Sequence, residues 1–316
     1  MLDVRQQLGE PGQPTQLRAP DAAVEVRQLG FRELTYRRFM AHPAAKWAAL
    51  GLGMIVVACY GAPLWHALFP GFVQSPTDFT LTQANQGPSL QHPFGTDSLL
   101  GHDIFSLVLY GGRLSIFIGI GGMVVAISIA IVVGAFSGYL GGPLDAVLMR
   151  IADINYSIPI LLTVPLAARV FGHANPLSIA IIFGIFSWPG PSRIVRSYFL
   201  TLRERQFTEA ARALGVSSWR IVYRHLLPNA VGPILVSFTL GIALNIVLEA
   251  FVSFLGFGIQ PPDYSWGSIL SNAQEYMVQG NWWWVTFPGL TIVATVMCIN
   301  FIGDGLRDAL DPKILR

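Results

Sequence analysis

The chain has 316 residues, of which 53% are hydrophobic and only 12% are charged, and its mean hydropathy is +0.52. Soluble domains usually carry about 25% charged residues, so this composition favours an integral membrane protein. The formal net charge of +2 is too small to indicate nucleic-acid binding. The two cysteines, Cys59 and Cys298, lie inside apolar runs and lack the spacing of a disulfide framework or a metal site.

The N-terminal segment 1–46 is polar and contains seven Lys or Arg residues. A cleaved signal peptide would begin its apolar stretch earlier, so we expect a cytoplasmic tail. Within it, Phe31–Met40 has apolar residues at positions 31, 34 and 39. This pattern predicts either a short helix on the inner membrane surface or a solvated basic flank.

Six apolar segments approach the roughly 20 residues that a membrane-spanning helix needs. They are Trp47–Phe69, Leu114–Tyr139, Ala146–Phe171, Leu177–Ser192, Ala230–Phe257 and Trp284–Ile302. Pro159 and Pro165 predict a kink in the third segment. The predicted fold is therefore all-α, with six transmembrane helices over residues 47–308 and tails over 1–46 and 309–316.

The positions of the basic residues predict the orientation. Of the 20 Lys and Arg residues, seven lie in the N-terminal tail, seven lie between Arg193 and Arg224, and three lie at the C-terminal end. The predicted outer loops 70–112 and 258–283 contain no Lys or Arg. We therefore expect both termini and the loop 200–228 to be cytoplasmic.

The segment 207–229, F-T-E-A-A-R-A-L-G-V-S-S-W-R-I-V-Y-R-H-L-L-P-N, is a charged amphipathic insert between two apolar runs. Thr208 is predicted to cap a first helix. Gly215 is predicted to end that helix, because glycine readily takes the left-handed conformation. One of the two serines that follow is predicted to cap a second helix, and Pro228 to end it.

A narrow apolar stripe runs along this insert, because Phe207, Ala211 and Leu214 recur at helical spacing. Arginines surround the stripe. The pattern predicts a helix that docks in the groove of a cytosolic partner. The alternative is an ordinary loop whose arginines anchor the neighbouring spans.

The spacing of E-A-A, three residues, Gly215 and a later L-P resembles the EAA loop of permease subunits in bacterial ABC importers. Further segments resemble the second, C-type permease of dipeptide and oligopeptide importers in the same order. They are H-P-F-G-T-D-S-L at 92–99, S-F-L-G-F-G-I-Q-P-P at 253–262 and F-I-G-D-G-L-R-D-A-L-D-P-K at 301–313. The resemblance implies a type I ABC importer permease fold in the bacterial inner membrane.

The same resemblance implies a set of coupling residues and partners. The residues that would couple the chain to an ATPase are Phe207, Glu209, Ala210, Ala211, Leu214 and Gly215. The partners would be a homologous second permease, two ATP-binding subunits and an extracytoplasmic binding protein that delivers di- or oligopeptides. Glutathione, nickel chelates and antimicrobial peptides are the alternative cargoes.

The chain offers no motif for using ATP itself, since it has only two lysines, Lys46 and Lys313, and neither lies in G-x-x-x-x-G-K-[ST]. It also lacks the motifs H-E-x-x-H and G-x-S-x-G of hydrolytic enzymes. We therefore expect no cofactor and no enzymatic activity in this chain, with ATP and Mg²⁺ bound by partner subunits. A secondary transporter, the remaining alternative, would normally show internal repeats, and we find none.

The first outer loop departs from the family pattern S-L-G-R-D after T-D. This chain has an extra leucine and carries His102 in place of the arginine. Asp97, His102 and Asp103 are candidate contacts for the binding protein, and we expect the trio to be exposed. His102 is interpreted either as a neutral surface histidine or as a pH-sensitive substitute for the arginine.

Charged and polar residues inside the predicted spans need partners. Arg150 and Asp153 are three residues apart and are predicted to neutralise each other. Glu249 and Asn245 share one face of the fifth span, either as structural polar contacts or as residues of the transport pathway or a gate. The tryptophans 282–284 are interpreted as an interfacial belt or, alternatively, as a substrate-stacking group.

Overall fold

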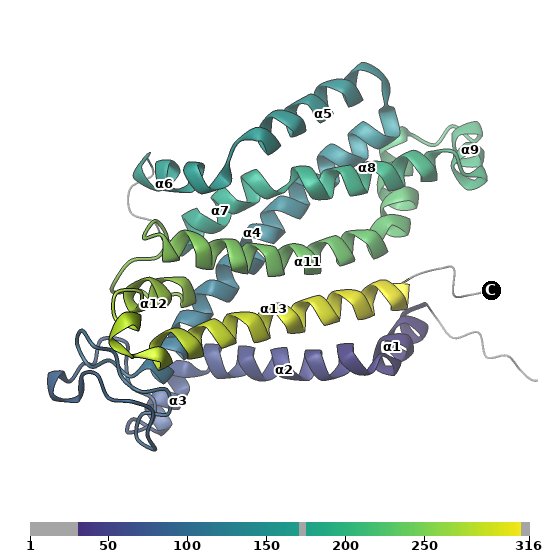
Figure 1. Ribbon diagram of the computed structural model, residues 1–316. Helices are drawn as coiled ribbons and strands as arrows, with labels where there is room; N and C mark the ends of the chain where they lie inside the picture. The colour runs from purple at the N-terminus through teal and green to yellow at the C-terminus, as the bar shows by residue number, and fades with distance from the viewer. Residues whose placement is uncertain (1–30, 171–174, 311–316) are drawn as a thin grey trace, which may run out of the picture.

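The computed structural model describes residues 31–170 and 175–310. Most of the predicted tails, residues 1–30 and 311–316, therefore lie outside the described residues. Within the described ranges there is no β-strand, only an isolated bridge between Thr96 and Asp103. The α-helices (Figure 1) are α1 Phe31–Ala41, α2 Pro43–Tyr60, α3 Ala62–Leu68, α4 Ile104–Leu140, α5 Gly142–Ser157, α6 Ile160–Val170, α7 Pro176–Ser187, α8 Pro189–Arg203, α9 Gln206–Ala213, α10 Ser218–Ile221, α11 Leu227–Phe254, α12 Trp266–Ala273 and α13 Trp282–Leu310.

The helices provide up to six membrane spans, which agrees with the predicted all-α membrane fold. Four continuous helical stretches are long and apolar enough to cross a membrane: α2, α4, α13 and the stretch Ser218–Phe254 that ends with α11. Two bent pairs, α5 with α6 and α7 with α8, supply the other two spans when each pair is counted as one.

Proline explains both bends. The axes of α5 and α6 differ by 79°, and the chain between them passes through Ile158 and Pro159. Pro159 has no backbone N–H and forces Ile158 into an extended conformation, with φ −80° and ψ 120°. The second bend, 46°, lies at Trp188 before Pro189. The predicted kink at Pro159 is confirmed, whereas Pro165 lies inside α6.

Several helix boundaries differ from the predicted ones. The first span ends at Tyr60, and α3 continues only after the break at Gly61. The second span starts at Ile104, ten residues before the predicted start, because the Asp103 carboxylate accepts from the Ser106 amide and caps the helix. The last span extends to Leu310, so the predicted boundary at 308 falls inside α13.

The two ends of the molecule have different structures (Figure 1). We call one the elbow end, because α9, the start of α1 and the end of α13 lie there, and the other the cap end, where α3, α12 and the long loop before α4 gather. The helix α4 joins them, since its 37 residues extend over about 55 Å. It packs against α7 and α8 on one side and against α11 on another.

The core follows this central helix. The largest buried cluster joins α4 to α11, α12 and α13, and a second cluster lies at the elbow end. The helix α1 packs against α13 and α2. The predicted helix Phe31–Met40 is therefore confirmed, while its location on a membrane surface stays a prediction.

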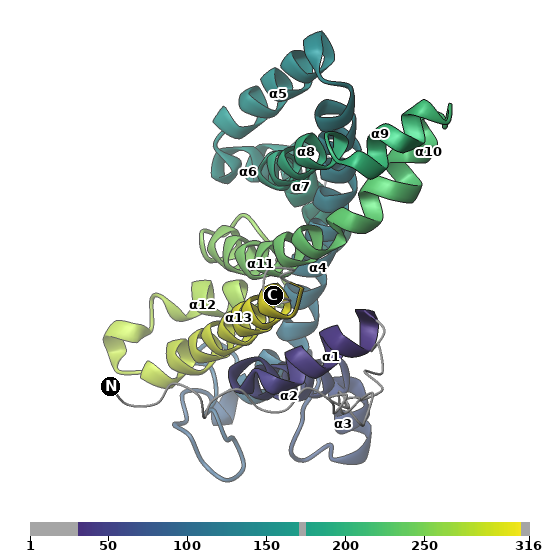
Figure 2. The ribbon, with the colours of Figure 1, turned by 90° about the vertical axis from the view of Figure 1, so that its right-hand side faces the viewer.

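The bent pair α5–α6 lies at the edge of the helix bundle, where α5 diverges from the other helices (Figure 2) while α6 packs against α7. It exposes large apolar side chains along its length, including Val147, Ile154 and Leu162, which are 56%, 57% and 72% exposed. Such a face is stable in lipid or against another apolar protein surface, and not in water.

Candidate functional site

The most exposed feature of the elbow end is a pair of short helices, residues 206–226, which we call the elbow. Its first helix, α9, ends in a Schellman motif. The amide of Gly215 donates to the carbonyl of Arg212 over 2.9 Å, and the amide of Val216 donates to that of Ala211 over 3.1 Å. Gly215 has φ +73°, which a residue with a Cβ rarely adopts. The prediction that Gly215 ends the first helix is confirmed.

The start of α9 differs from the prediction. The N-cap is Arg205, whose side chain makes no capping bond, and Thr208 lies inside the helix. The Thr208 hydroxyl donates to the carbonyl of Leu202 over 2.8 Å, and its side chain is fully buried. Thr208 therefore ties α9 to the end of α8, and the predicted cap at Thr208 is wrong.

The elbow presents some of its predicted coupling residues to the outside and directs one of them inward. Glu209, Ala210 and Gly215 are exposed. Phe207 and Leu214 are also exposed, at 42% and 82%.

In contrast, Ala211 is only 8% exposed and belongs to the buried cluster at the elbow end with Tyr139, Phe199 and Leu226. The guanidinium group of Arg212 lies 5.2 Å from the centre of the Tyr139 ring. The three residues of the apolar stripe therefore face different ways: Phe207 and Leu214 are exposed, whereas Ala211 packs into the core. Ala211 therefore connects α9 to the cluster that α4 and α8 form.

The second half of the elbow runs without a break into α11. A π-helical segment, Val222–Leu226, follows α10, and the helical stretch Ser218–Phe254 has 37 residues. Pro228 lies in the first turn of α11, directly after this π-helical segment. The prediction that Pro228 ends the second helix is therefore wrong, and the elbow is continuous with a spanning helix.

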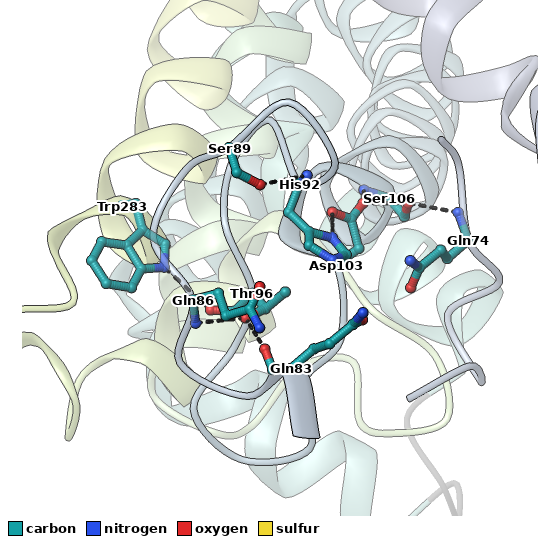
Figure 3. Close-up of polar contacts among 9 residues, drawn as sticks. All are labelled: Gln74, Gln83, Gln86, Ser89, His92, Thr96, Asp103, Ser106 and Trp283. Atoms are coloured by element: carbon teal, nitrogen blue, oxygen red, sulfur yellow. Dashed lines mark hydrogen bonds and ion pairs between the residues drawn. The ribbon is translucent and has the colours of Figure 1, made fainter. Parts of the chain in front are cut away.

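At the opposite end, residues 69–103 form a compact loop, which we call the cap. Figure 3 shows the polar contacts that fasten it to the start of α4. The Asp103 carboxylate accepts from the hydroxyl and the amide of Ser106, over 2.6 and 2.8 Å, and hydrogen-bonds the His92 ring over 3.0 Å. The Ser106 hydroxyl in turn accepts from the amide of Gln74 over 2.8 Å. The N-cap of α4 thus holds two separate parts of the cap, at Gln74 and at His92.

The extra leucine is accommodated by Asp97. One carboxylate oxygen of Asp97 accepts from the amides of Leu99, Leu100 and Gly101, at 2.7 to 3.1 Å. The other accepts from the His102 ring over 2.7 Å. Burial alone would raise the pKa of Asp97, but these hydrogen bonds outweigh burial and hold its pKa below the usual range.

The expectation that Asp97, His102 and Asp103 are exposed is wrong. Their exposed fractions are 3%, 6% and 2%. Their side chains pair within the cap because an unpaired charge would be costly there. The described residues contain no group of three or more His, Cys, Asp or Glu side chains that would hold a metal ion.

The cap also rests on the start of α13. The Trp283 indole donates to the carbonyl of Thr96 over 3.2 Å, and the Phe94 and Phe287 rings stack with their centres 4.1 Å apart. Trp284 is buried, whereas Trp282 is 55% exposed. The three tryptophans therefore have different environments, and only Trp282 has the exposure that an interfacial belt requires.

Glu249 and Asn245 lie in the packed interior between helices. Glu249 is fully buried and accepts from the hydroxyls of Ser115, in α4, and Ser253, one turn along α11. Asn245 is 3% exposed, and its side chain contacts the carbonyl of Gly119 and the hydroxyl of Ser187. These contacts favour the interpretation of both residues as structural polar contacts.

Asp153 does not pair with Arg150. Its carboxylate lies 2.8 Å from the guanidinium group of Arg193, at the start of α8. Both partners are about half exposed, so the pair is worth little by itself. The predicted pairing within α5 is wrong because α8 brings a closer arginine to the same carboxylate.

Sequence reasoning missed His92, Ser115 and Ser253 as polar partners. Ser115 and Glu249 are 134 residues apart, so no local spacing connects them. The available signal was chemical: a carboxylate inside an apolar run requires hydrogen-bond donors, and serines are the small donors that such runs carry.

Taken together, the described residues form a bundle of long apolar helices, with the exposed elbow at one end and the cap at the other. The structure of the MetNI methionine ABC transporter in an inward-facing conformation has a related fold. One of its chains aligns with a TM-score of 0.56 over 67% of this chain and 100% of that one, at 20% identity. This chain therefore shares the fold of that ABC transporter chain.

The family is shown by sequence. Residues 130–316 match the model of the binding-protein-dependent transport system inner membrane component, and the chain belongs to this family. It is 39% identical to the oligopeptide transport system permease protein OppC of Haemophilus influenzae, over 92% of each chain. It is 38% identical to the dipeptide transport system permease protein DppC of Bacillus subtilis, over 93% of this chain and 89% of that one. The chain is a multi-pass membrane protein and a transport component.

Proposed function

We propose that this chain is one permease subunit of an ATP-driven peptide importer, with the elbow in the cytoplasm and the cap outside. The observation that carries the proposal is the elbow itself. Its outer face, with Glu209 and Gly215, is open, while Ala211 on the same helix is packed against α4 and α8. A helix with one free face and one anchored face is suited to pass a partner's movement to the spans.

The distribution of basic residues supports this orientation. Of the seven arginines between Arg193 and Arg224, five lie in the elbow or directly before it, and the region from residue 70 to residue 112 has no Lys or Arg. Basic residues are retained on the cytoplasmic side of membrane proteins. Both ends of the chain would then be cytoplasmic as well, because α1 and the end of α13 lie at the elbow end (Figure 1).

The energy would come from two ATP-binding subunits that hold ATP and Mg²⁺. This chain has no phosphate-binding lysine motif to do so itself. Each ATPase subunit would receive one elbow, this chain's or that of a homologous second permease. The exposed apolar faces of α5–α6 suit contact with that second permease, and the transport path would lie between the two subunits.

In this mechanism the ATPase subunits close on ATP and push α9. Ala211 and Thr208 transmit the push to the ends of α4 and α8, and the unbroken helix Ser218–Phe254 carries it toward the cap end. The two permeases would alternate between outward-open and inward-open states. A binding protein would deliver the cargo to the cap end.

The peptide cargo is proposed from the relatives, whose names specify oligopeptide and dipeptide transport. Affinity purification of this chain from its native membrane tests the assembly, and we expect a second permease and two copies or types of ATPase to co-purify. Uptake of a labelled dipeptide, with glutathione and a nickel chelate as competitors, tests the cargo. Recovery of the chain without any ATPase, under conditions that preserve membrane complexes, would contradict the proposal.

A further inference from the structure

The loop between α11 and α12, residues 255–265, is exposed at its tip and tied at both ends. Gln260, Pro261, Pro262 and Asp263 are exposed. Near its start, the amide of Ile259 donates to the Ser253 hydroxyl over 3.2 Å. These residues belong to the S-F-L-G-F-G-I-Q-P-P segment, for which the fold alone gives no role.

Just after the loop's end, the amide of Trp266 donates to the Ser115 hydroxyl over 3.1 Å. The two serines come from different helices, α11 and α4. Each therefore holds one end of the loop against a different part of the core.

Both serine hydroxyls donate to the same carboxyl group. The Ser115 hydroxyl lies 2.8 Å from one oxygen of Glu249, and the Ser253 hydroxyl lies 2.7 Å from the other. A hydroxyl has only one proton, so donating it to Glu249 turns the lone pairs of each serine toward the backbone amides. Glu249 thus orients both serine hydroxyls that hold the loop. Hydrogen bonds that are linked in a chain strengthen one another.

The residues around these hydrogen bonds are closely packed, so the loop has no space to take another conformation. A Cβ atom on Gly258 would collide with the Ser253 side chain, so the loop approaches α11 as closely as its backbone permits. The Trp266 ring is fully buried, and its indole N–H donates to the carbonyl of Val108 over 2.9 Å. The loop is therefore held in one conformation by a fully buried base, by which we mean Ser115, Glu249, Ser253 and Trp266.

Glu249 itself is enclosed by this single chain, without any partner subunit present. In this conformation its carboxyl group reaches neither a transport path between subunits nor a cargo. Its effect on the outside is indirect, through the loop. The Tyr264 ring in that loop lies 6.1 Å, between ring centres, from the His102 ring, so the loop packs against the cap.

We propose that Glu249 is a positioning residue that fixes the α11–α12 loop as a contact surface for the extracytoplasmic binding protein. The inference rests on the function proposed above. The loop carries Asp263 and two prolines on a rigid base, which lowers the entropy lost when a partner binds. Loosening this base would lower the affinity for the binding protein more than it would lower the maximal rate of uptake.

The test is Glu249→Gln in the complete, reconstituted complex. The carboxamide has the same size but only one acceptor oxygen, so one serine loses its partner and one end of the loop is released. We expect the binding-protein concentration for half-maximal uptake to rise by about tenfold, the size expected when a buried polar group loses its hydrogen-bond partner. Maximal uptake should change by less than about twofold.

The matched control is Glu275→Gln, which makes the same chemical change at an exposed residue between α12 and α13. It should leave both quantities unchanged. Hydrogen exchange gives a readout independent of transport, and we expect the amides of Ile259 and Trp266 to exchange faster in the Glu249 variant. Ser253→Ala removes the hydroxyl that holds the Ile259 amide and leaves Glu249 in place, so it should free the Ile259 amide alone. It serves as the second variant where Glu249→Gln impairs assembly.

Two results would overturn the inference. One is faster amide exchange with an unchanged requirement for the binding protein. The other is a loss of maximal uptake alone, which would make Glu249 a purely structural residue. Failure of the function proposed above is distinguishable, because the unsubstituted complex would then show no response to a binding protein at any concentration.

Discussion

The backbone amide of Gly215 donates to the carbonyl of Arg212 over 2.9 Å and closes the turn at the tip of the elbow. Because Gly215 takes φ +73°, the chain reverses direction, and the next amide, that of Val216, donates to the carbonyl of Ala211 over 3.1 Å. The turn directs the chain back toward the core, where Ile221 and Leu226 rejoin the cluster that holds Ala211. The shape of the exposed surface is thus set by one backbone conformation.

Gly215→Ala is expected to reduce peptide uptake with little effect on the amount of protein in the membrane. A Cβ at this φ costs about 1 kcal/mol or more, which is enough to shift the turn. The measurement is uptake and ATP hydrolysis in the same vesicles, and the ratio of ATP hydrolysed to peptide imported should rise. Gly280→Ala is the control, because Gly280 also has positive φ, +93°, and open space around it, but lies away from the elbow. Equal uptake in the two variants would contradict the role of the turn.

Glu209→Ala is expected to weaken binding of an ATPase subunit. The side chain is exposed and has no ion-pair partner among the described residues, so its removal leaves the fold of the elbow intact. Loss of a charge-assisted contact with a partner should weaken the association by about tenfold. Co-purification of the ATPase with the tagged permease measures this effect. Glu204→Ala, at an exposed glutamate before α9, provides the control, and similar losses in both variants would count against a specific contact.

Ala211→Leu and Ala210→Leu should differ in their effect on the stability of the protein. Ala211 is 8% exposed in a packed cluster, so added methyl groups should cost about 1–3 kcal/mol and lower the melting temperature of the purified protein. Ala210 is exposed, so the same change there should leave the melting temperature unchanged and disturb only the partner contact. A drop in melting temperature for Ala210→Leu, with none for Ala211→Leu, would contradict the observed orientation of α9.

The stability of the cap should depend on pH through Asp97. Its pKa in the folded protein lies below the ordinary value of 3.8, so the carboxylate stabilises the cap above that value. This contribution should be lost as pH falls through the lower, folded-state pKa. Hydrogen exchange of the Leu99 to Gly101 amides measures it, with rates corrected for the intrinsic pH dependence.

Asp97→Asn should accelerate exchange of these amides at neutral pH and remove the acid-dependent change. Asp263→Asn, at an exposed aspartate, should do neither. An unchanged exchange profile in Asp97→Asn would show that the turn is held by other contacts.

Much of the fold could be predicted from the sequence because its signals are local. Apolar runs of spanning length, the kink at Pro159 and the helix end at Gly215 each depend on a few neighbouring residues, and the structure confirms them. The relationship to peptide permeases was also predictable, since several motifs occur in the same order. Helix starts were less accurate: the cap at Asp103 and the interior position of Thr208 depend on which hydrogen bonds the folded chain makes.

The environment of the candidate residues could not be predicted, because it depends on distant parts of the chain. His102 was expected at the surface, but Asp97 and the rings of Phe79 and Tyr264 enclose it. Arg150 was the nearest arginine to Asp153 in sequence, but Arg193 is its partner in space. The roles of the elbow residues in coupling remain predictions.

Transport against a concentration gradient tests the central claim most directly. Labelled peptide is measured inside vesicles that contain either the complete assembly or this chain alone, with ATP and Mg²⁺ on the elbow side and binding protein on the cap side. We predict accumulation only in vesicles with the complete assembly and ATP. Accumulation of peptide above the external concentration by the isolated chain would contradict the account, because the chain would then need no partner to drive it.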